Sequence, residues 1–189
     1  DAGVKRYTQL FDGANLDTFE VSQAEFEAAE TQVSDALKAA IALAKKNIET
    51  FHRSQLKQPE QVETSKGIQC WQEYRGIEKV GLYIPGGTAP LFSSVLMLAV
   101  PAQIAGCKDV ILVTPPNKEG LINPAILYCA KVCGISTVYK VGGIQAIAGL
   151  TLGTDSIPQV YKIFGPGNQY VTVAKQFATK FGVAIDMPA

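Results

Sequence analysis

The amino-acid sequence predicts an α/β fold in which a mainly parallel sheet lies between two layers of helices, preceded by a helical segment. Four turns support this prediction, because each follows a short apolar run typical of a β-strand. Three of them lead directly into a segment with helical periodicity, and a polar loop follows the second. Repeated strand–turn–helix units indicate parallel strands, since parallel neighbours need a crossover. The turns are residues 83–87, 114–116, 141–143 and 164–168.

The order of these units also predicts where a ligand binds. Crossovers of a single hand place all four turns along one edge of the sheet, at the carboxyl ends of the strands. Open α/β sheets bind their ligands at that edge. We therefore expect the functional surface there.

The composition excludes several classes of partner and structure. Seventeen basic residues balance seventeen acidic ones, so no excess of charge indicates nucleic acid or an anionic membrane. Four cysteines in 189 residues are too few to predict a disulfide scaffold. Residues 80–107 carry no charge, but glycine, proline, serine and glutamine interrupt them, so the apolar run of ~18 residues that a membrane span needs is missing.

The two ends of the sequence are unusual. The chain starts at Asp1 without an initiator methionine or a signal peptide. At the other end, an apolar run over 183–186 is typical of a strand, and the sequence stops three residues later. We expect both ends to be cuts through a larger protein.

The N-terminal part predicts two helices. Residues 1–21 show too little periodicity for any element to be assigned. Ser22 and Glu25 have the spacing of a capping box, which marks a helix start. A second helix should start at Ser34 and run to about Gln55, because apolar residues recur there every three to four positions.

The next segment predicts a connector and two strands. Residues 57–67 are polar, and the runs 68–75 and 79–84 read as adjoining strands on either side of a glycine. Near Tyr83 the sequence changes from charged and helical to α/β alternation. This change predicts two domains, 1–82 and 83–189.

The rest of the chain predicts alternating helices and strands. Pro101 should kink or restart the first of these helices, because proline cannot donate a backbone hydrogen bond. Gly134 and Gly182 stand where helices usually end in glycine. The predicted helices are 91–105, 123–133, 144–152 and 168–181, and the predicted strands are 110–113, 137–141, 161–164 and 183–186.

The glycines of three turns indicate the class of ligand. Glycine lets the backbone turn sharply and lets a ligand approach it closely. The helix that follows offers unpaired N–H groups suited to a phosphate. Ordinary turn chemistry explains any single glycine turn, whereas Gly86-Gly87, Gly142-Gly143 and Gly165-Pro166-Gly167 on one edge favour a nucleotide-like or anionic ligand. The sequence has neither a Gly-x-Gly-x-x-Gly fingerprint nor a phosphate-binding loop ending in Gly-Lys-Ser/Thr.

Three side chains at these turns are candidate ligand contacts. Asn168 follows a glycine at a helix start, where it can cap the helix and still contact a ligand. Gln145 lies in the first turn of another predicted helix, a position where glutamine is not a preferred cap. Tyr83 closes a strand, so it is either a core residue or a wall against which a ring can stack.

The remaining reactive residues do not predict a catalytic group. His52, the single histidine, lies near the end of a long helix, where histidine usually interacts with the helix terminus or with solvent. Cys129 and Cys133 are one helical turn apart and read as a buried apolar pair, because further metal ligands are missing. The residues thus predict a binding edge without catalytic residues and without a metal site.

At these segments the sequence resembles the histidinol dehydrogenase family. The resemblance extends over essentially the whole chain and includes the Tyr-Ile-Pro-Gly-Gly turn, the Val-Gly-Gly-Ile-Gln run and the Gly-Pro-Gly-Asn turn. The matching segments are 11–13, 47–52, 80–87, 90–93, 141–148, 162–168 and 185–189.

The resemblance implies a function and a fold. Members oxidise L-histidinol through L-histidinal to L-histidine, the last steps of histidine biosynthesis, with two NAD molecules and one zinc ion per active site. The implied fold is Rossmann-like and similar to aldehyde dehydrogenase, in a cytoplasmic homodimer. By motif, the implied NAD contacts are Tyr83, Gln145 and Asn168.

The resemblance also implies that part of the enzyme is missing from this sequence. In the family, the zinc ligands, the Glu-His acid/base pair and most substrate contacts follow the Asp-Met-Pro-Ala segment at 186–189. The first domain of the family is completed by later chain, so residues 1–82 should be part of a discontinuous domain. We therefore expect the chain to be inactive alone.

Two alternatives stay open from the sequence. One is an aldehyde-dehydrogenase-like oxidoreductase with a cysteine nucleophile, for which Cys107 beside Lys108 is the best candidate. The other is a non-catalytic module that binds a nucleotide or a protein through the same glycine-lined edge.

Overall fold

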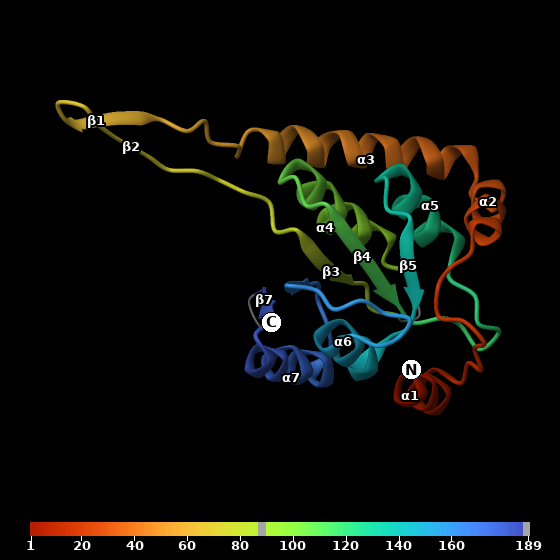
Figure 1. Cartoon of the computed structure of the whole chain (residues 1–189). Helices are drawn as coiled ribbons and strands as arrows, with labels where there is room; N and C mark the ends of the chain where they lie inside the picture. Colours follow the sequence, from red (N-terminus) through yellow and green to blue (C-terminus); the bar gives the residue numbers. More distant parts are fainter. Residues whose placement is uncertain (87–89, 187–189) are drawn as a thin grey trace.

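The centre of the molecule is a five-stranded sheet in the order β5-β4-β3-β6-β7. The structure is a computed structural model that describes residues 1–86 and 90–186 (Figure 1). All four strand pairings are parallel, which confirms the predicted α/β fold. The strands are β3 Lys79–Tyr83, β4 Asp109–Thr114, β5 Thr137–Lys140, β6 Lys162–Phe164 and β7 Ala184–Ile185.

Helices cover both faces of this sheet. Because side chains alternate along a strand, Leu112 of β4 packs into one core while Ile111 and Val113 pack into the other. The first core contains the helices α4 Phe92–Ile104 and α5 Pro124–Val132, and the second contains α6 Gly143–Leu152 and α7 Gln169–Ala178.

Three N-terminal helices add to these layers. Helix α2 (Gln23–Gln32) packs on α5, helix α3 (Asp35–Arg53) packs on α4, and helix α1 (Ala2–Asp12) packs on α6. The capping box at the start of α2 is complete, as predicted. Helix α1 was not predicted; it contributes Val4 to the second core, while its aromatic and leucine side chains stay exposed. The exposed residues are Tyr7, Leu10 and Phe11.

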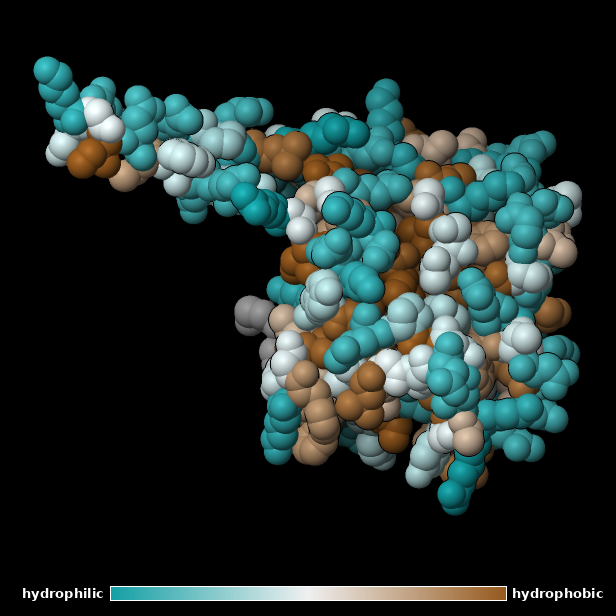
Figure 2. Space-filling model, in the orientation of Figure 1, coloured by the Kyte–Doolittle hydropathy of each residue, from teal (hydrophilic) through white to brown (hydrophobic). Residues whose placement is uncertain are grey.

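The segment between α3 and β3 forms an arm that projects from the body (Figure 1). Strands β1 (Gln61–Ser65) and β2 (Ile68–Trp71) pair with each other antiparallel, and every residue of both is exposed. Figure 2 shows the arm as mostly hydrophilic, with isolated hydrophobic side chains. The predicted connector therefore contains a strand. The sequence predicted that β2 would adjoin β3, but in the structure β2 pairs with β1.

Most predicted element boundaries hold to within two residues. Helix α4 runs continuously through Pro101, so the predicted restart is absent in the described chain. Gly134 (φ 66°) and Gly182 (φ 81°) are left-handed residues that follow helices, as predicted. The last helix ends earlier than predicted, at Ala178, and a 3-10 turn over Thr179–Phe181 follows.

Some sequence predictions are untested by this fold. Gly87 and residues 187–189 lie outside the described residues. The division into 1–82 and 83–189 stays a prediction; in the structure, side chains of α2 and α3 share a core with α4, α5 and the sheet. No helix among residues 1–86 and 90–186 is long and apolar enough to cross a membrane.

Candidate functional site

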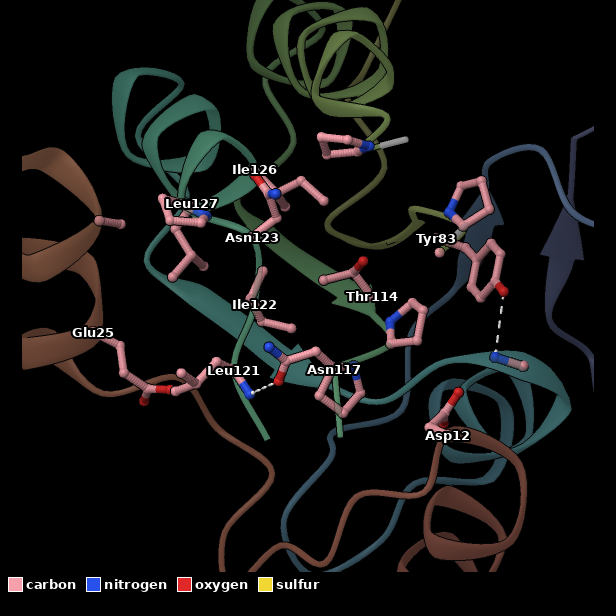
Figure 3. A pocket seen from close by; sticks show the side chains of 18 of the residues that line it. Asp12, Glu25, Tyr83, Thr114, Asn117, Leu121, Ile122, Asn123, Ile126 and Leu127 are labelled. Carbon is pink, nitrogen blue, oxygen red and sulfur yellow. Dashed lines mark hydrogen bonds between the residues drawn. The ribbon is translucent and has the colours of Figure 1, made fainter. Parts of the chain in front are cut away.

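A hollow of about 1180 Å³ opens at the carboxyl edge of the sheet (Figure 3). Each of the four predicted turns contributes a lining residue: Tyr83, Thr114, Gly143 and Asn168. The prediction that these turns share one edge is therefore confirmed. The volume is slightly above the roughly 300–1,000 Å³ typical of small-molecule pockets, which suits an extended ligand.

Tyr83 connects two of the turns. Its hydroxyl accepts a hydrogen bond of 3.3 Å from the backbone N–H of Gly143, at the start of α6 (Figure 3). The side chain is buried at the end of β3, and burial raises the pKa of its phenol. Tyr83 is thus both a core residue and part of the pocket wall, the two interpretations left open by the sequence.

Gln145 lies behind the wall of the hollow. It is buried, and it is not among the residues that line the pocket. Its Nε2 donates a hydrogen bond of 3.1 Å to Oδ2 of Asp12, which does line it. Its Oε1 is buried and has no hydrogen-bond partner in the described part of the chain. A buried amide oxygen without a donor is costly, so this oxygen can still accept a hydrogen bond.

Asn168 caps helix α7 and lines the hollow. Its Oδ1 accepts hydrogen bonds of 3.0 Å from the backbone N–H groups of Tyr170 and Val171. Because Oδ1 is used for capping, the Nδ2 amide group is the part of this side chain available to a ligand. Capping by Asn168 therefore leaves one end of its amide group unused.

The glycines of the turns pack closely against neighbouring protein atoms. A side chain at Gly86 or Gly142 would overlap the ring of Pro115, and one at Gly165 would overlap the backbone oxygen of Tyr83. These glycines let the turns pack on one another. Their presence is explained by packing, so the ligand interpretation rests on the hollow and not on glycine alone.

Two carboxylates are the charged side chains that line the hollow, and no lysine or arginine lines it among the described residues. Glu25 is paired with Lys140 at 3.1 Å. Asp12 forms no ion pair within residues 1–86 and 90–186. Burial raises the pKa of Asp12, and the hydrogen bond from Gln145 partly opposes that effect.

A buried ion pair supports the turn before α7. Lys175 is buried and donates a 2.8 Å hydrogen bond to the carbonyl of Gly165. It also pairs with Asp186, whose Oδ2 accepts a 2.8 Å hydrogen bond from the N–H of Gly165. The pair therefore holds both backbone groups of Gly165. The sequence did not predict this pair; a lysine at a position of α7 that faces the core was the available signal.

The described residues hold no group of three or more His, Cys, Asp or Glu side chains arranged to bind a metal ion. Cys129 and Cys133 are buried as predicted, and burial raises the pKa of their thiols to about 12 and about 11. His52 interacts with Gln55 at 2.8 Å near the end of α3 and does not line the hollow.

Cys107 lies at the opposite edge of the sheet from the hollow. It precedes β4, which starts at Asp109, so it is at the amino end of the strands. Burial raises the pKa of its thiol, which disfavours the thiolate that a nucleophile requires. The neighbouring Lys108 is paired with Glu78 at 3.7 Å. Position and chemistry both argue against the cysteine-nucleophile alternative.

The fold and the hollow define a protein of the open parallel α/β class with a hollow at the carboxyl ends of its strands, the edge at which such sheets bind ligands. The family follows from sequence comparison. The chain belongs to the histidinol dehydrogenase family, whose model matches residues 1–189.

Individual relatives agree with this assignment. The histidinol dehydrogenases of Bacteroides fragilis and Bacteroides thetaiotaomicron are each 59% identical over 189 residues, which is all of this chain and 44% of each relative. The crystal structure of histidinol dehydrogenase from Elizabethkingia anophelis matches with a TM-score of 0.98 at 57% identity, again over 100% of this chain and 44% of that one. The chain thus spans less than half the length of these relatives.

Proposed function

We propose that this chain is the NAD-binding part of a longer histidinol dehydrogenase. The whole enzyme would oxidise L-histidinol through L-histidinal to L-histidine, using two NAD molecules and one zinc ion per active site, as a cytoplasmic homodimer. The observation that carries the proposal is the hollow at the carboxyl edge of the sheet, in a chain whose residues 1–189 all lie within the family match. By analogy with its relatives, the whole protein would be more than twice as long as this chain.

The residues of the hollow fit a dinucleotide. Of the lining residues, Tyr83 offers an aromatic ring and Asn168 offers the Nδ2 group as a donor. Behind the wall, the buried Oε1 of Gln145 has no hydrogen-bond partner within residues 1–86 and 90–186. The N-cap residue of α6, Gly142, has no side chain that could cap the helix, and of its first N–H groups that of Gly143 donates to the Tyr83 hydroxyl, whereas the side chain of Asn168 caps α7. The start of α6 therefore suits the pyrophosphate better. NAD, when bound, accepts the hydride, and these residues bind and orient it.

The described residues do not fit zinc, since no three potential ligands converge. We therefore assign the zinc ligands and the acid/base pair of the reaction to other parts of the longer protein. Oxidation of an alcohol with zinc needs the metal to orient the substrate and a base to take its proton. The chain itself would bind and orient the nucleotide, without the groups for proton transfer.

Two measurements on the purified chain test the proposal. With L-histidinol and NAD it should produce no NADH, whereas isothermal titration calorimetry should detect NAD binding weaker than micromolar, because part of the cleft belongs to other chain segments. NADH formation by residues 1–189 would refute the absence of catalytic groups. Complete absence of NAD binding at millimolar concentration would refute the nucleotide site.

Labelling with iodoacetamide separates this proposal from the cysteine-nucleophile alternative. Cys107 should react no faster than Cys70, which is exposed on the arm. NAD should leave the labelling of Cys107 unchanged, because the thiol lies at the other edge of the sheet. Preferential labelling of Cys107, blocked by NAD, would support the alternative.

A further inference from the structure

Asp12 is a partly buried carboxylate whose charge is not balanced by a cation. It lines the hollow, and the described chain provides it with one hydrogen bond, from the neutral amide of Gln145. Burial raises its pKa, which shows that the surroundings disfavour the charged form. Carboxylates removed from water are normally paired with a cation or saturated by hydrogen bonds. Asp12 therefore has unused capacity to accept hydrogen bonds.

The position of Asp12 does not serve helix α1. It is the last residue of that helix, and Gly13 in the left-handed conformation (φ 71°) follows as the C-cap. A negative charge at the C-terminal end of a helix is unfavourable, because the helix dipole is negative there. Local stability thus gives no reason for a carboxylate at this position.

Asp12 instead belongs to the group of residues around the start of α6. It accepts the hydrogen bond of Gln145 in the first turn of that helix. Its charge also adds to the effect of burial in raising the pKa of Tyr83, so the carboxylate and the phenol interact. In Figure 3 the Asp12 carboxylate points toward the turn where Tyr83 meets Gly143.

We propose that Asp12 accepts hydrogen bonds from the hydroxyls of the adenosine ribose and excludes a 2′-phosphate, and that it positions Gln145. This inference rests on the proposed function, because it places an NAD molecule in the hollow. In Rossmann folds a carboxylate binds the ribose hydroxyls of NAD, whereas a basic side chain accommodates the 2′-phosphate of NADP. Asp12 would serve the same purpose from a different place in the chain. The described lining contains Asp12 and no basic residue.

The test compares NAD and NADP binding to the purified 189-residue chain by NMR titration at millimolar ligand. The unmodified chain should bind NAD about tenfold more tightly than NADP, since an additional phosphate would meet a carboxylate without a cation. In Asp12→Asn the preference should fall to about threefold or less, mainly through weaker NAD binding, because a hydrogen bond to a charged group is lost. Amide resonances of the first turn of α6 should also shift in the variant.

The matched control is Asp17→Asn, which removes the same charge from a fully exposed side chain whose ion pair within the described chain is with Lys5, at 3.9 Å. It should leave the preference for NAD unchanged. An Asp12→Asn chain that keeps the preference, or an unmodified chain without one, would refute the role of Asp12 while NAD binding itself stands. If neither dinucleotide binds the unmodified chain, the proposed function fails and the role of Asp12 fails with it.

Discussion

Asn168 is the residue at which structural and ligand roles overlap most. Its Oδ1 satisfies two backbone N–H groups of α7, and its Nδ2 remains for the hollow. Because the two ends of one amide have different roles, substitutions can separate them. Serine keeps an oxygen that caps a helix but has no amide N–H, and alanine has neither group.

We predict different effects for Asn168→Ala and Asn168→Ser. Alanine should lower the free energy of unfolding by about 1 kcal/mol, because the cap is lost. Serine should change it by less than about 0.5 kcal/mol. Both should weaken NAD binding by a similar factor, measured by calorimetry, if Nδ2 is the ligand contact. Unimpaired NAD binding in Asn168→Ser would limit Asn168 to capping.

Asp12 should make the stability of the chain depend on pH. Its folded pKa is raised above its ordinary value of 3.8, so the folded state favours the protonated form. The contribution of Asp12 to the free energy of unfolding is therefore fully present below pH 3.8, and it is lost as the pH rises through the folded pKa.

Asp12→Asn should consequently melt at a higher temperature than the parent at pH 7, with a difference that shrinks as the pH approaches 3.8. Thermal unfolding followed by circular dichroism at several pH values measures this difference. Asp17→Asn is the control, because no comparable gain is expected from an exposed carboxylate. A lower melting temperature for Asp12→Asn at pH 7 would show that the charge stabilises the fold.

At the level of elements, the turn between β6 and α7 depends on Gly165. This residue has φ 131°, and a side chain on it would overlap the backbone oxygen of Tyr83 in the neighbouring strand. Lys175 and Asp186 hold its two backbone groups in place. The turn is therefore fixed by both steric contact and hydrogen bonds.

Gly165→Ala should lower the free energy of unfolding by at least about 1–3 kcal/mol, because both the conformation and the contact oppose a side chain. Gly182→Ala is the matched control: it also has positive φ (81°), but nothing among the described atoms lies within 4 Å of the added carbon. Its loss should be smaller, since only backbone strain contributes. Urea unfolding of both variants measures the difference, and equal losses would show that the contact with Tyr83 is unimportant.

The burial of an element determines whether the sequence predicts it. Strand β4 is apolar from Val110 to Val113 because both faces of the sheet are covered there, and its sequence signal is clear. Strand β1 buries no side chain, and helix α1 buries only Val4 and Thr8 among the described residues, so neither has the apolar run that marks a central strand such as β4.

The candidate site shows the same limit. The sequence placed Tyr83, Thr114, Gly143 and Asn168 at one edge, because the rules for parallel strands determine where the turns go. It did not place Asp12 there, since contact between Asp12 and Gln145 joins segments 133 residues apart. Contacts of that kind depend on how helices pack, and turn chemistry does not predict them.

At the scale of the whole molecule, two parts differ strongly in burial. The body has cores on both sides of the five-stranded sheet. The arm of β1 and β2 is exposed at every residue and includes Val62, Ile68 and Trp71 with more than half of their surface accessible. Two strands without a covering layer are marginally stable in water. The arm therefore adds little to the stability of the body.

Amide hydrogen exchange should resolve these two parts in the isolated chain. Amides of β3 and β4 lie in the centre of the sheet and should exchange only through global unfolding, whereas those of β1 and β2 should exchange through local opening, many-fold faster. Deleting residues 61–71 and joining the ends by glycines should leave the protection of β4 unchanged, which serves as the control for the body. If the arm were protected as strongly as β4, another surface would have to cover it in solution. If that protection depended on protein concentration, the covering surface would be a second copy of the chain.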